Sequence, residues 1–486
     1  MSTKRISFIE VIIWLFVFLL LALVISPFGL GFKIKEDYSA LTQKMSDMMQ
    51  VDIRIAKYDR GFFSSDAIVE VQVPGMPVSI QLKENIIHGP VYLGLINQGK
   101  SPFIAAVVKG ELLSAAGFES VVEQIFSGQS AIAYQSLIDF TGNVDVEGYM
   151  PPVDTVIEQD TGPLVIKSSG MLVTSHYSSA DEKISGENKL SKFVLKSEDI
   201  NIDLNNLNIS FSGKMGENNL LMGDSVLSLD KLDVQTNNEQ FALSNFSVSS
   251  VSTEAGMLVN AQLRMNAQEV LLSNQKLGPV IFALSVNGLN ANSLNQITEM
   301  QKSMEEKVQQ GIPPEQLNAM MTGQMMGIVP ELFKQAVITI DPLSIQSELG
   351  KLESSLDFSV DGLDQNAPAD PMFLLSAINF EMDMSVDEAL LKQLVEWQLT
   401  ANENKVAATG NKQARKAEAD IPMAQKVEEN LKGLVDENWL TYADAKYSSQ
   451  IKLQQGLMMV NDKEVDPMAQ MMSQMGGGSP APTPAP

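Results

Sequence analysis

The stretch "INIDLNNLNISF" at residues 200–211 decides the fold class, because its apolar side chains recur at every second position. Ile200, Ile202 and Leu204 alternate with asparagine and aspartate, and the pattern resumes at Leu207. Such alternation places apolar side chains on one face of a β-strand and polar side chains on the other. The stretch therefore predicts strands of a sheet with one apolar face.

Similar short runs extend from about residue 164 to residue 290, separated by clusters of Asn, Asp, Ser and Gly. This spacing predicts a mainly β (β-rich α+β) protein, built as an extended, curved antiparallel sheet or a sandwich rather than a doubly wound α/β domain. The polar positions are rich in Asn, Ser and Gln, which favours one large sheet with a solvated outer face. We expect residues 51–292 to form this β-rich region.

A helical insertion is expected at residues 293–335, where helix-forming residues replace the alternation and Pro313-Pro314 marks the start of a second helix. It is rich in methionine, at Met300, Met304, Met320, Met321, Met325 and Met326. Flexible thioethers suit surfaces that adapt to apolar partners, but ordinary packing of amphipathic helices against the sheet is the favoured interpretation. Strands and further helices resume over 336–466, and the Met-, Gly-, Ala- and Pro-rich tail at 467–486 is expected to be disordered.

The N-terminus predicts a membrane segment. Residues 11–25, "VIIWLFVFLLLALVI", are unbroken apolar sequence, and the span 8–30 has bilayer length. Lys4 and Arg5 precede it, so residues 1–7 are expected to remain in the cytoplasm while the rest crosses the membrane. A cleavable signal peptide is the alternative, but no A-x-A site follows, which favours an uncleaved signal anchor. Residues 31–50 are expected to contain a membrane-proximal helix.

The composition argues against several classes of function. The chain has 59 acidic and 34 basic residues and a formal net charge of -25, which repels nucleic-acid phosphates. It has no cysteine, so disulfides and thiolate metal sites are excluded, and its two histidines are His88 and His176. No nucleic acid, cofactor or metal is therefore expected as a partner.

Two serines raise the question of a nucleophile. Ser64 and Ser65 lie in "YDRGFFSSDAIVEV" at residues 58–71, before an alternating apolar run. No G-x-S-x-G elbow is present, and the stretch is better explained as the turn of a β-hairpin. In that hairpin Gly61 is expected to adopt the left-handed conformation that glycine tolerates.

His88 lies in "IIHGP", where a strand is expected to end, and an imidazole at this position could titrate near neutral pH or bind a metal. A metal would need distant carboxylate ligands. The favoured interpretation is that the ring bonds a backbone carbonyl at a turn.

A calcium loop is the third candidate, in "NVDVEGYMPPVD" at residues 143–154. The residues at the first, third, fifth, sixth and twelfth loop positions are Asn143, Asp145, Glu147, Gly148 and Asp154. Val144 and Val146 instead alternate as in a strand, and Pro151-Pro152 oppose an exiting helix. The interpretation as an EF-hand is therefore disfavoured.

Four segments carry a family resemblance. They are "YDRGFFSSDA" at 58–67, "ENIIHGPVYLG" at 84–94, "LGPVIFALSVNGLNANSLNQI" at 277–297 and "YSSQIKLQQGLMMVNDKEV" at 447–465. In this order, after an N-terminal apolar segment, they resemble the YdgA-like family of bacterial proteins. The resemblance implies a β-rich protein anchored in the inner membrane of a Gram-negative bacterium, with its bulk in the periplasm, in a family of unknown function without established catalytic residues.

These observations lead to an expectation of a non-enzymatic, single-pass inner-membrane protein with no catalytic, cofactor-binding or metal-binding residues. The first hypothesis is that it binds lipid or another apolar ligand along an amphipathic β-sheet. The alternative is a scaffold or assembly factor for other envelope proteins, and an envelope hydrolase is the least favoured. The oligomeric state stays open.

Overall fold

The structure, a computed structural model, describes residues 36, 38–44, 46, 51–72, 79–117, 119–159, 162–237, 239–272, 275–309, 312–360, 376–408 and 422–465. The expected anchor at 8–30 and the tail at 467–486 lie outside these ranges. Within them, no helix is both long enough and apolar enough to cross a membrane.

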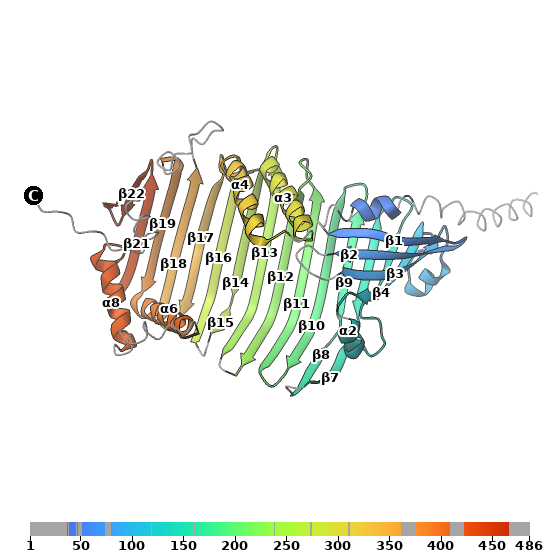
Figure 1. Ribbon diagram of the computed structural model, residues 1–486, viewed down its shortest axis with the longest axis horizontal. Coiled ribbons are helices and arrows are strands. Elements are labelled where there is room, and N and C mark those ends of the chain that lie inside the picture. Colours follow the sequence, from blue (N-terminus) through green and yellow to red (C-terminus); the bar gives the residue numbers. More distant parts are fainter. Residues whose placement is uncertain are drawn as a thin grey trace, which may run out of the picture. The chain divides into compact units, whose positions relative to one another are not determined.

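The chain divides into two compact units, Met1–Asn238 and Glu239–Pro486 (Figure 1). Each is mainly β, and every strand pairing within a unit is antiparallel, which confirms the predicted class. The described strands of each unit form one sheet rather than a sandwich of two, because each strand pairs edge to edge with its neighbours.

Unit 1 contains twelve strands in its described part. They are β1 Asp52–Arg60, β2 Ser64–Gln72, β3 Ser79–His88, β4 Ala106–Ala115, β5 Ala133–Ile138, β6 Val144–Met150, β7 Val153–Gln159, β8 Gly162–Ser168, β9 Met171–Ser178, β10 Lys183–Lys196, β11 Ile200–Met215 and β12 Leu221–Thr236. The spatial order runs from β1 to β6, then β9, β10, β11 and β12, while β8 also pairs with β10 and β7 with β8. A 3₁₀ helix, η1 Leu93–Gln98, α2 Glu119–Phe126 and helical residues 38–44 complete the described part.

The stretch 200–211 forms β11, as its alternation predicts. Leu204 pairs with Leu232 and Leu207 with Leu229, and the register between β11 and β12 is the same before and after Asn206. Asn206 has a left-handed φ of 53°, and its side-chain amide donates to Asp230 at 2.7 Å. Both apolar runs therefore belong to one strand, and this left-handed residue lies where their alternation changes phase.

Unit 2 contains β13 to β23 and four helices in its described part. The strands are β13 Gln240–Ala255, β14 Leu258–Ala267, β15 Glu269–Leu272, β16 Gln275–Asn290, β17 Val337–Ser347, β18 Gly350–Val360, β19 Ile378–Asp387, β20 Thr441–Ala443, β21 Lys446–Gln454, β22 Leu457–Val460 and β23 Lys463–Val465. The helices are α3 Ala291–Gln309, α4 Pro314–Phe333, α6 Glu388–Ala408 and α8 Met423–Asp436. The predicted helical insertion is thus present as α3 and α4, between β16 and β17.

The core of unit 2 lies between the sheet and the pair α6–α8. Leu390 of α6 and Leu431 of α8 pack with Val386 of β19 and Tyr447 of β21, and all four side chains are buried. Val386 and Tyr447 are direct cross-strand partners, so the two helices cover one end of the sheet face.

The hairpin at residues 58–71 forms as predicted, with β1 and β2 joined at 61–63. The expected left-handed conformation of Gly61 is wrong, because Gly61 does not have a positive φ. Glycine is required for a different reason: its N–H donates to the Ser64 carbonyl at 2.8 Å, and a Cβ would overlap with that same oxygen. The turn is closed by this approach of backbone to backbone.

The packing of α6 predicts a large effect of Leu390→Ala. Removing this fully buried side chain should lower the free energy of unfolding by about 2–5 kcal/mol through lost transfer energy and a residual cavity. Denaturant unfolding followed by the fluorescence of Trp397 and Trp439 in unit 2 measures the change. Leu349→Ala, at an exposed site of the same unit, should change it by less than about 0.5 kcal/mol, and equal effects of the two variants would contradict this account of the core.

Candidate functional site

The largest chemical feature of unit 2 is a sheet face on which apolar side chains continue from strand to strand. Directly paired residues share a face, and the central row across six strands is Leu263, Leu284, Ile340, Leu356, Met382 and Ile451. The next row is Ala261, Val286, Ile338, Phe358, Phe380 and Leu453. We call these two rows the apolar rows.

The opposite face is polar at the neighbouring positions. The row displaced by one residue is Gln262, Ser285, Thr339, Asp357, Glu381 and Lys452. Lys452 pairs with Glu381 at 2.8 Å, and the Thr339 hydroxyl donates to Asp357 at 2.7 Å. Solvent can hydrogen-bond the polar side chains of this face, so the sheet has one solvated polar face and one apolar face.

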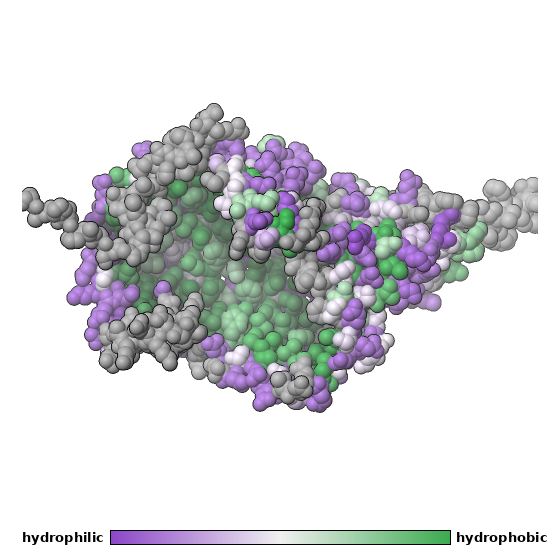
Figure 2. All heavy atoms as spheres, in the orientation of Figure 1, coloured by the Kyte–Doolittle hydropathy of each residue, from purple (hydrophilic) through white to green (hydrophobic). Residues whose placement is uncertain are grey.

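The apolar rows are only half-buried. All twelve side chains have intermediate exposure, in contrast to the buried residues beneath α6 and α8. Figure 2 shows apolar side chains gathered in a hollow over the strands of unit 2, beside α3 and α4. Among the described residues, the apolar rows therefore keep part of their surface exposed.

The helices α3 and α4 pack on each other and contact β16. Met300 of α3 and Leu332 of α4 are buried, as ordinary packing requires, whereas Met320, Met321 and Val329 of α4 are exposed. The two interpretations of the methionines therefore apply to different residues of the insertion. Met300 packs within the protein, and α4 presents Met320 and Met321 to solvent.

Unit 1 brings together two of the residues singled out in the sequence. The Ser65 Oγ lies 2.9 Å from His88 Nε2, and the side chains are 1% and 3% exposed. The other ring nitrogen, Nδ1, lies 3.3 Å from the Phe62 carbonyl oxygen, as the turn interpretation of His88 predicts. A carbonyl only accepts, so Nδ1 carries the proton and Nε2 accepts from the serine hydroxyl.

The Ser65–His88 pair has the connectivity of a nucleophile and its base, but its surroundings differ from an active site. The ring is oriented by a carbonyl rather than a carboxylate, and neither residue lines any of the described pockets. The backbone N–H of His88 also donates to the Phe63 carbonyl at 2.8 Å. The pair ties the β1–β2 turn to the end of β3.

A second buried polar cluster surrounds Glu84 on β3. Tyr38, from the helix at 38–44, and Tyr134, from β5, each donate a hydrogen bond to a different carboxyl oxygen of Glu84. Gly110 lies between Glu84 and Tyr134 in the same cross-strand row, and a Cβ there would overlap with the tyrosine ring. Tyr58 of β1 packs beside Tyr38, with ring centroids 6.3 Å apart. The cluster joins the helix to three strands.

Burial raises the pKa of Glu84 above its ordinary value, and the hydrogen bonds from Tyr134 and Tyr38 offset this only in part. Burial together with the nearby Glu84 also raises the pKa values of Tyr38 and Tyr134, so both remain protonated donors. Sequence reasoning missed this cluster. The signal was present, because Glu84 falls in phase with Leu82 and Ile86, on the apolar side of β3.

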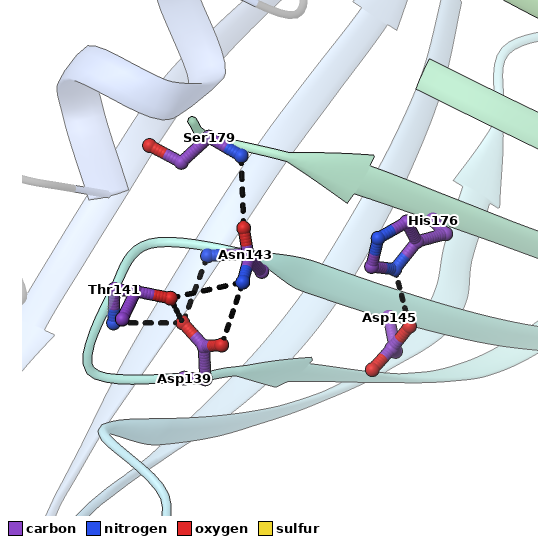
Figure 3. A network of polar contacts seen from close by, with 6 residues as sticks. All are labelled: Asp139, Thr141, Asn143, Asp145, His176 and Ser179. Atoms are coloured by element: carbon purple, nitrogen blue, oxygen red, sulfur yellow. Dashed lines mark hydrogen bonds and ion pairs between the residues drawn. The ribbon is translucent and has the colours of Figure 1, made fainter. Parts of the chain in front are cut away.

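The calcium candidate forms a strand, β6, as its alternation predicts. Asp145 hydrogen-bonds His176 Nδ1 at 2.7 Å (Figure 3). Glu147 pairs with Lys100 at 3.6 Å, so both carboxylates engage side chains of neighbouring segments. Asp154 lies on β7. The five candidate residues do not form a loop, and no group of acidic or histidine side chains suited to a metal occurs within the described ranges.

The turn before β6 is held by Asp139. Its carboxylate accepts from the backbone and hydroxyl of Thr141 at 2.8 and 2.7 Å, and from the backbone and side chain of Asn143, both at 2.9 Å (Figure 3). Burial acts to raise the pKa of Asp139, but these bonds outweigh it, so the pKa lies below its ordinary value. Asn143 in turn accepts from the Ser179 N–H at 2.9 Å.

An open pocket of about 820 Å³ lies beside this turn. Its lining combines apolar side chains, including Phe103, Leu137 and Phe211, with the Asp145–His176 pair. Asp145 and His176 hydrogen-bond each other at its wall.

A family model described as bacterial protein of unknown function (DUF945) matches residues 8–468. Protein YdgA of Escherichia coli strain K12 is 21% identical over 336 residues, which cover 64% of this chain and 64% of that protein. The chain therefore spans less than two thirds of the length of this relative. No solved structure matches.

The two histidines provide a matched test of the β1–β2 turn. His88→Ala should lower the free energy of unfolding of unit 1 by about 1–3 kcal/mol, because it leaves buried polar groups unsatisfied. His176→Ala, at an exposed site, should cost less than about 0.5 kcal/mol. Hydrogen exchange of the backbone amides at 61–65 measures the change in stability in each variant. Unchanged protection in His88→Ala would contradict a structural role for His88.

The Glu84 cluster predicts a pH dependence of stability. Because the folded-state pKa is raised, the contribution of Glu84 to stability is fully present below the ordinary glutamate pKa and is lost as pH rises through the folded value. Glu84→Gln should therefore become progressively more stable relative to the parent protein as pH rises. Thermal unfolding of both proteins across the pH range measures the difference. Glu111→Gln, at an exposed site on β4, is the control, and a pH-independent difference for Glu84→Gln would refute the assignment.

Proposed function

The chain belongs to the DUF945 family of bacterial proteins of unknown function, and from the apolar face of unit 2 we propose that it is a non-enzymatic, membrane-anchored envelope protein that binds lipid acyl chains. Residues 8–30 anchor it in the inner membrane, and its bulk lies in the periplasm. The single observation that carries the proposal is the pair of apolar rows, which stay half-buried while the same strands present a polar opposite face.

The dimensions of the apolar rows suit an extended hydrocarbon chain. Six antiparallel strands span roughly 24 Å, at about 4.8 Å between neighbours, and two rows on each strand add about 7 Å. Acyl chains can cover such a surface because they need no hydrogen-bond partners. Water or a polar ligand on the same surface would leave its own polar groups without partners.

The partial exposure of the apolar rows supports a ligand that binds reversibly. Where α6 and α8 cover the sheet, side chains such as Val386 and Leu390 are excluded from solvent completely. Leu356 and Met382 lie further along the same strands and keep partial exposure. A permanent hydrophobic core would be excluded from solvent, as the residues beneath α6 and α8 are. A binding surface would keep partial exposure in the unbound protein, as the apolar rows do.

A scaffold or assembly function is the second candidate, favoured by the exposed Met320, Met321 and Val329 of α4. Flexible methionine side chains adapt to different apolar partners. An envelope hydrolase remains the least favoured function, because the Ser65–His88 pair is almost completely shielded from any substrate.

The test is native mass spectrometry, with lipid extraction, of the full chain purified from membranes. Phospholipid should copurify at a defined stoichiometry, and Leu284→Gln/Leu356→Gln should lower its occupancy about tenfold, equivalent to about 1.4 kcal/mol. The matched control, Ser285→Gln/Asp357→Gln, changes the neighbouring residues on the polar face and should retain the lipid. Equal occupancy in the two variants would contradict the proposal, and a lipid-free parent protein would favour the scaffold.

A further inference from the structure

Three loops of unit 1 lie side by side at one end of its sheet and expose large apolar side chains. They are the β1–β2 turn, the β3–β4 connection and the β5–β6 turn. The His88 N–H bonds the Phe63 carbonyl at 2.8 Å, and the Ala105 N–H bonds the Ile138 carbonyl at 3.0 Å, so backbone hydrogen bonds join neighbouring loops.

The exposed side chains on these loops are Phe62, Phe63, Leu93, Ile96, Phe103 and Phe140. Their exposed fractions range from 44% to 67%. Isolated exposed apolar residues are common on proteins, but four phenylalanines on three adjoining loops form a set that calls for a partner. We call this set the aromatic loop end.

Each loop is held by contacts that fix its backbone. The buried Ser65–His88 pair holds the carbonyls of Phe62 and Phe63, whose rings contact each other edge to face. Phe103 forms a β-bridge with Val91. The four hydrogen bonds accepted by Asp139 close the turn that carries Phe140. The apolar side chains are therefore presented by ordered loops, which lowers the entropic cost of binding.

The chain length to the expected anchor places this end within reach of the membrane. Tyr38 lies eight steps along the chain from position 30, and extended chain spans at most about 3.5 Å per step, or roughly 28 Å. Tyr38 is bonded to Glu84, four residues before the end of β3, a distance of roughly 13 Å along the strand. The Glu84 cluster thus fixes where the chain that follows the expected anchor joins the sheet. Either end of the sheet is in reach, and the exposed phenylalanines distinguish this one.

We propose that the aromatic loop end docks unit 1 on the lipid surface of the membrane, with its phenylalanine side chains at the boundary between headgroups and acyl chains. The proposal rests on the anchor in the proposed function and not on lipid binding by unit 2. Apolar groups bury to roughly 5–10 Å at such boundaries, and removing Phe and Leu side chains from water favours the bound state. Docking would hold the sheet in one orientation at the bilayer.

The absence of cysteine allows single labels in the full chain. Nitroxide labels would be placed at Phe103→Cys or Phe140→Cys, with the protein in phosphatidylethanolamine–phosphatidylglycerol nanodiscs. The matched control is Val121→Cys, exposed on α2, which follows β4, whereas Phe103 precedes it. These ends of β4 lie roughly 33 Å apart.

The ratio of collisions with oxygen to collisions with a water-soluble nickel chelate should be several-fold higher for both loop labels than for Val121→Cys. Equal ratios would overturn the docking, and so would loop labels protected from both reagents, which would indicate a protein interface instead. Failure of the chain to co-elute with nanodiscs would overturn the anchor and the docking together. Loss of lipid from unit 2 alone would leave the result unchanged, so the two proposals fail separately.

Discussion

The structure depends on one constraint, namely that a single-layer sheet with alternating side chains has an apolar face that something must cover. In the described part of unit 2, α6 and α8 cover one end of that face, where Val386 and Leu390 are fully buried. Most domains resolve the constraint by packing a second layer over the whole sheet. Here the apolar rows remain half-buried, and the proposed function follows from the need to cover them.

Unit 1 differs in having buried polar side chains among its apolar contacts. Glu84 accepts from two tyrosines, and His88 links Ser65 to the β1–β2 turn. Buried polar groups destabilise a fold unless each finds a partner, so these pairings specify where the helix at 38–44 and the loops must lie. These buried pairings hold the loops whose outward-facing side chains carry the proposed contact with lipid.

The sequence predicts the class of the fold well, because alternation is a local property. The runs around Ile202 and Leu207 become β11, and the helical insertion appears between β16 and β17. The left-handed conformation of Asn206 does not follow from the alternation, although the change of phase between the two runs marks its position. Gly61 was assigned the wrong physical role, since its close approach to Ser64 is a contact that only the folded hairpin reveals.

The candidate site was less accessible to prediction. Which apolar positions share a row depends on strand register, and register between Leu284 and Leu356 passes through β17 and its irregularity between Ile340 and Leu343. The partners of Glu84 are 46 and 50 residues away in the sequence. Alternation alone could still have identified Glu84 as a charge on an apolar face, which is a general sign of a buried network.

The most direct test of the central claim is photo-crosslinking in living cells, with a benzophenone amino acid at Leu356 or, as the control, at Asp357. Lipid binding by the apolar face predicts a covalent lipid adduct at Leu356, identified by mass spectrometry of the purified chain, and none at Asp357. A protein adduct at Leu356, or no adduct at either position, would contradict it.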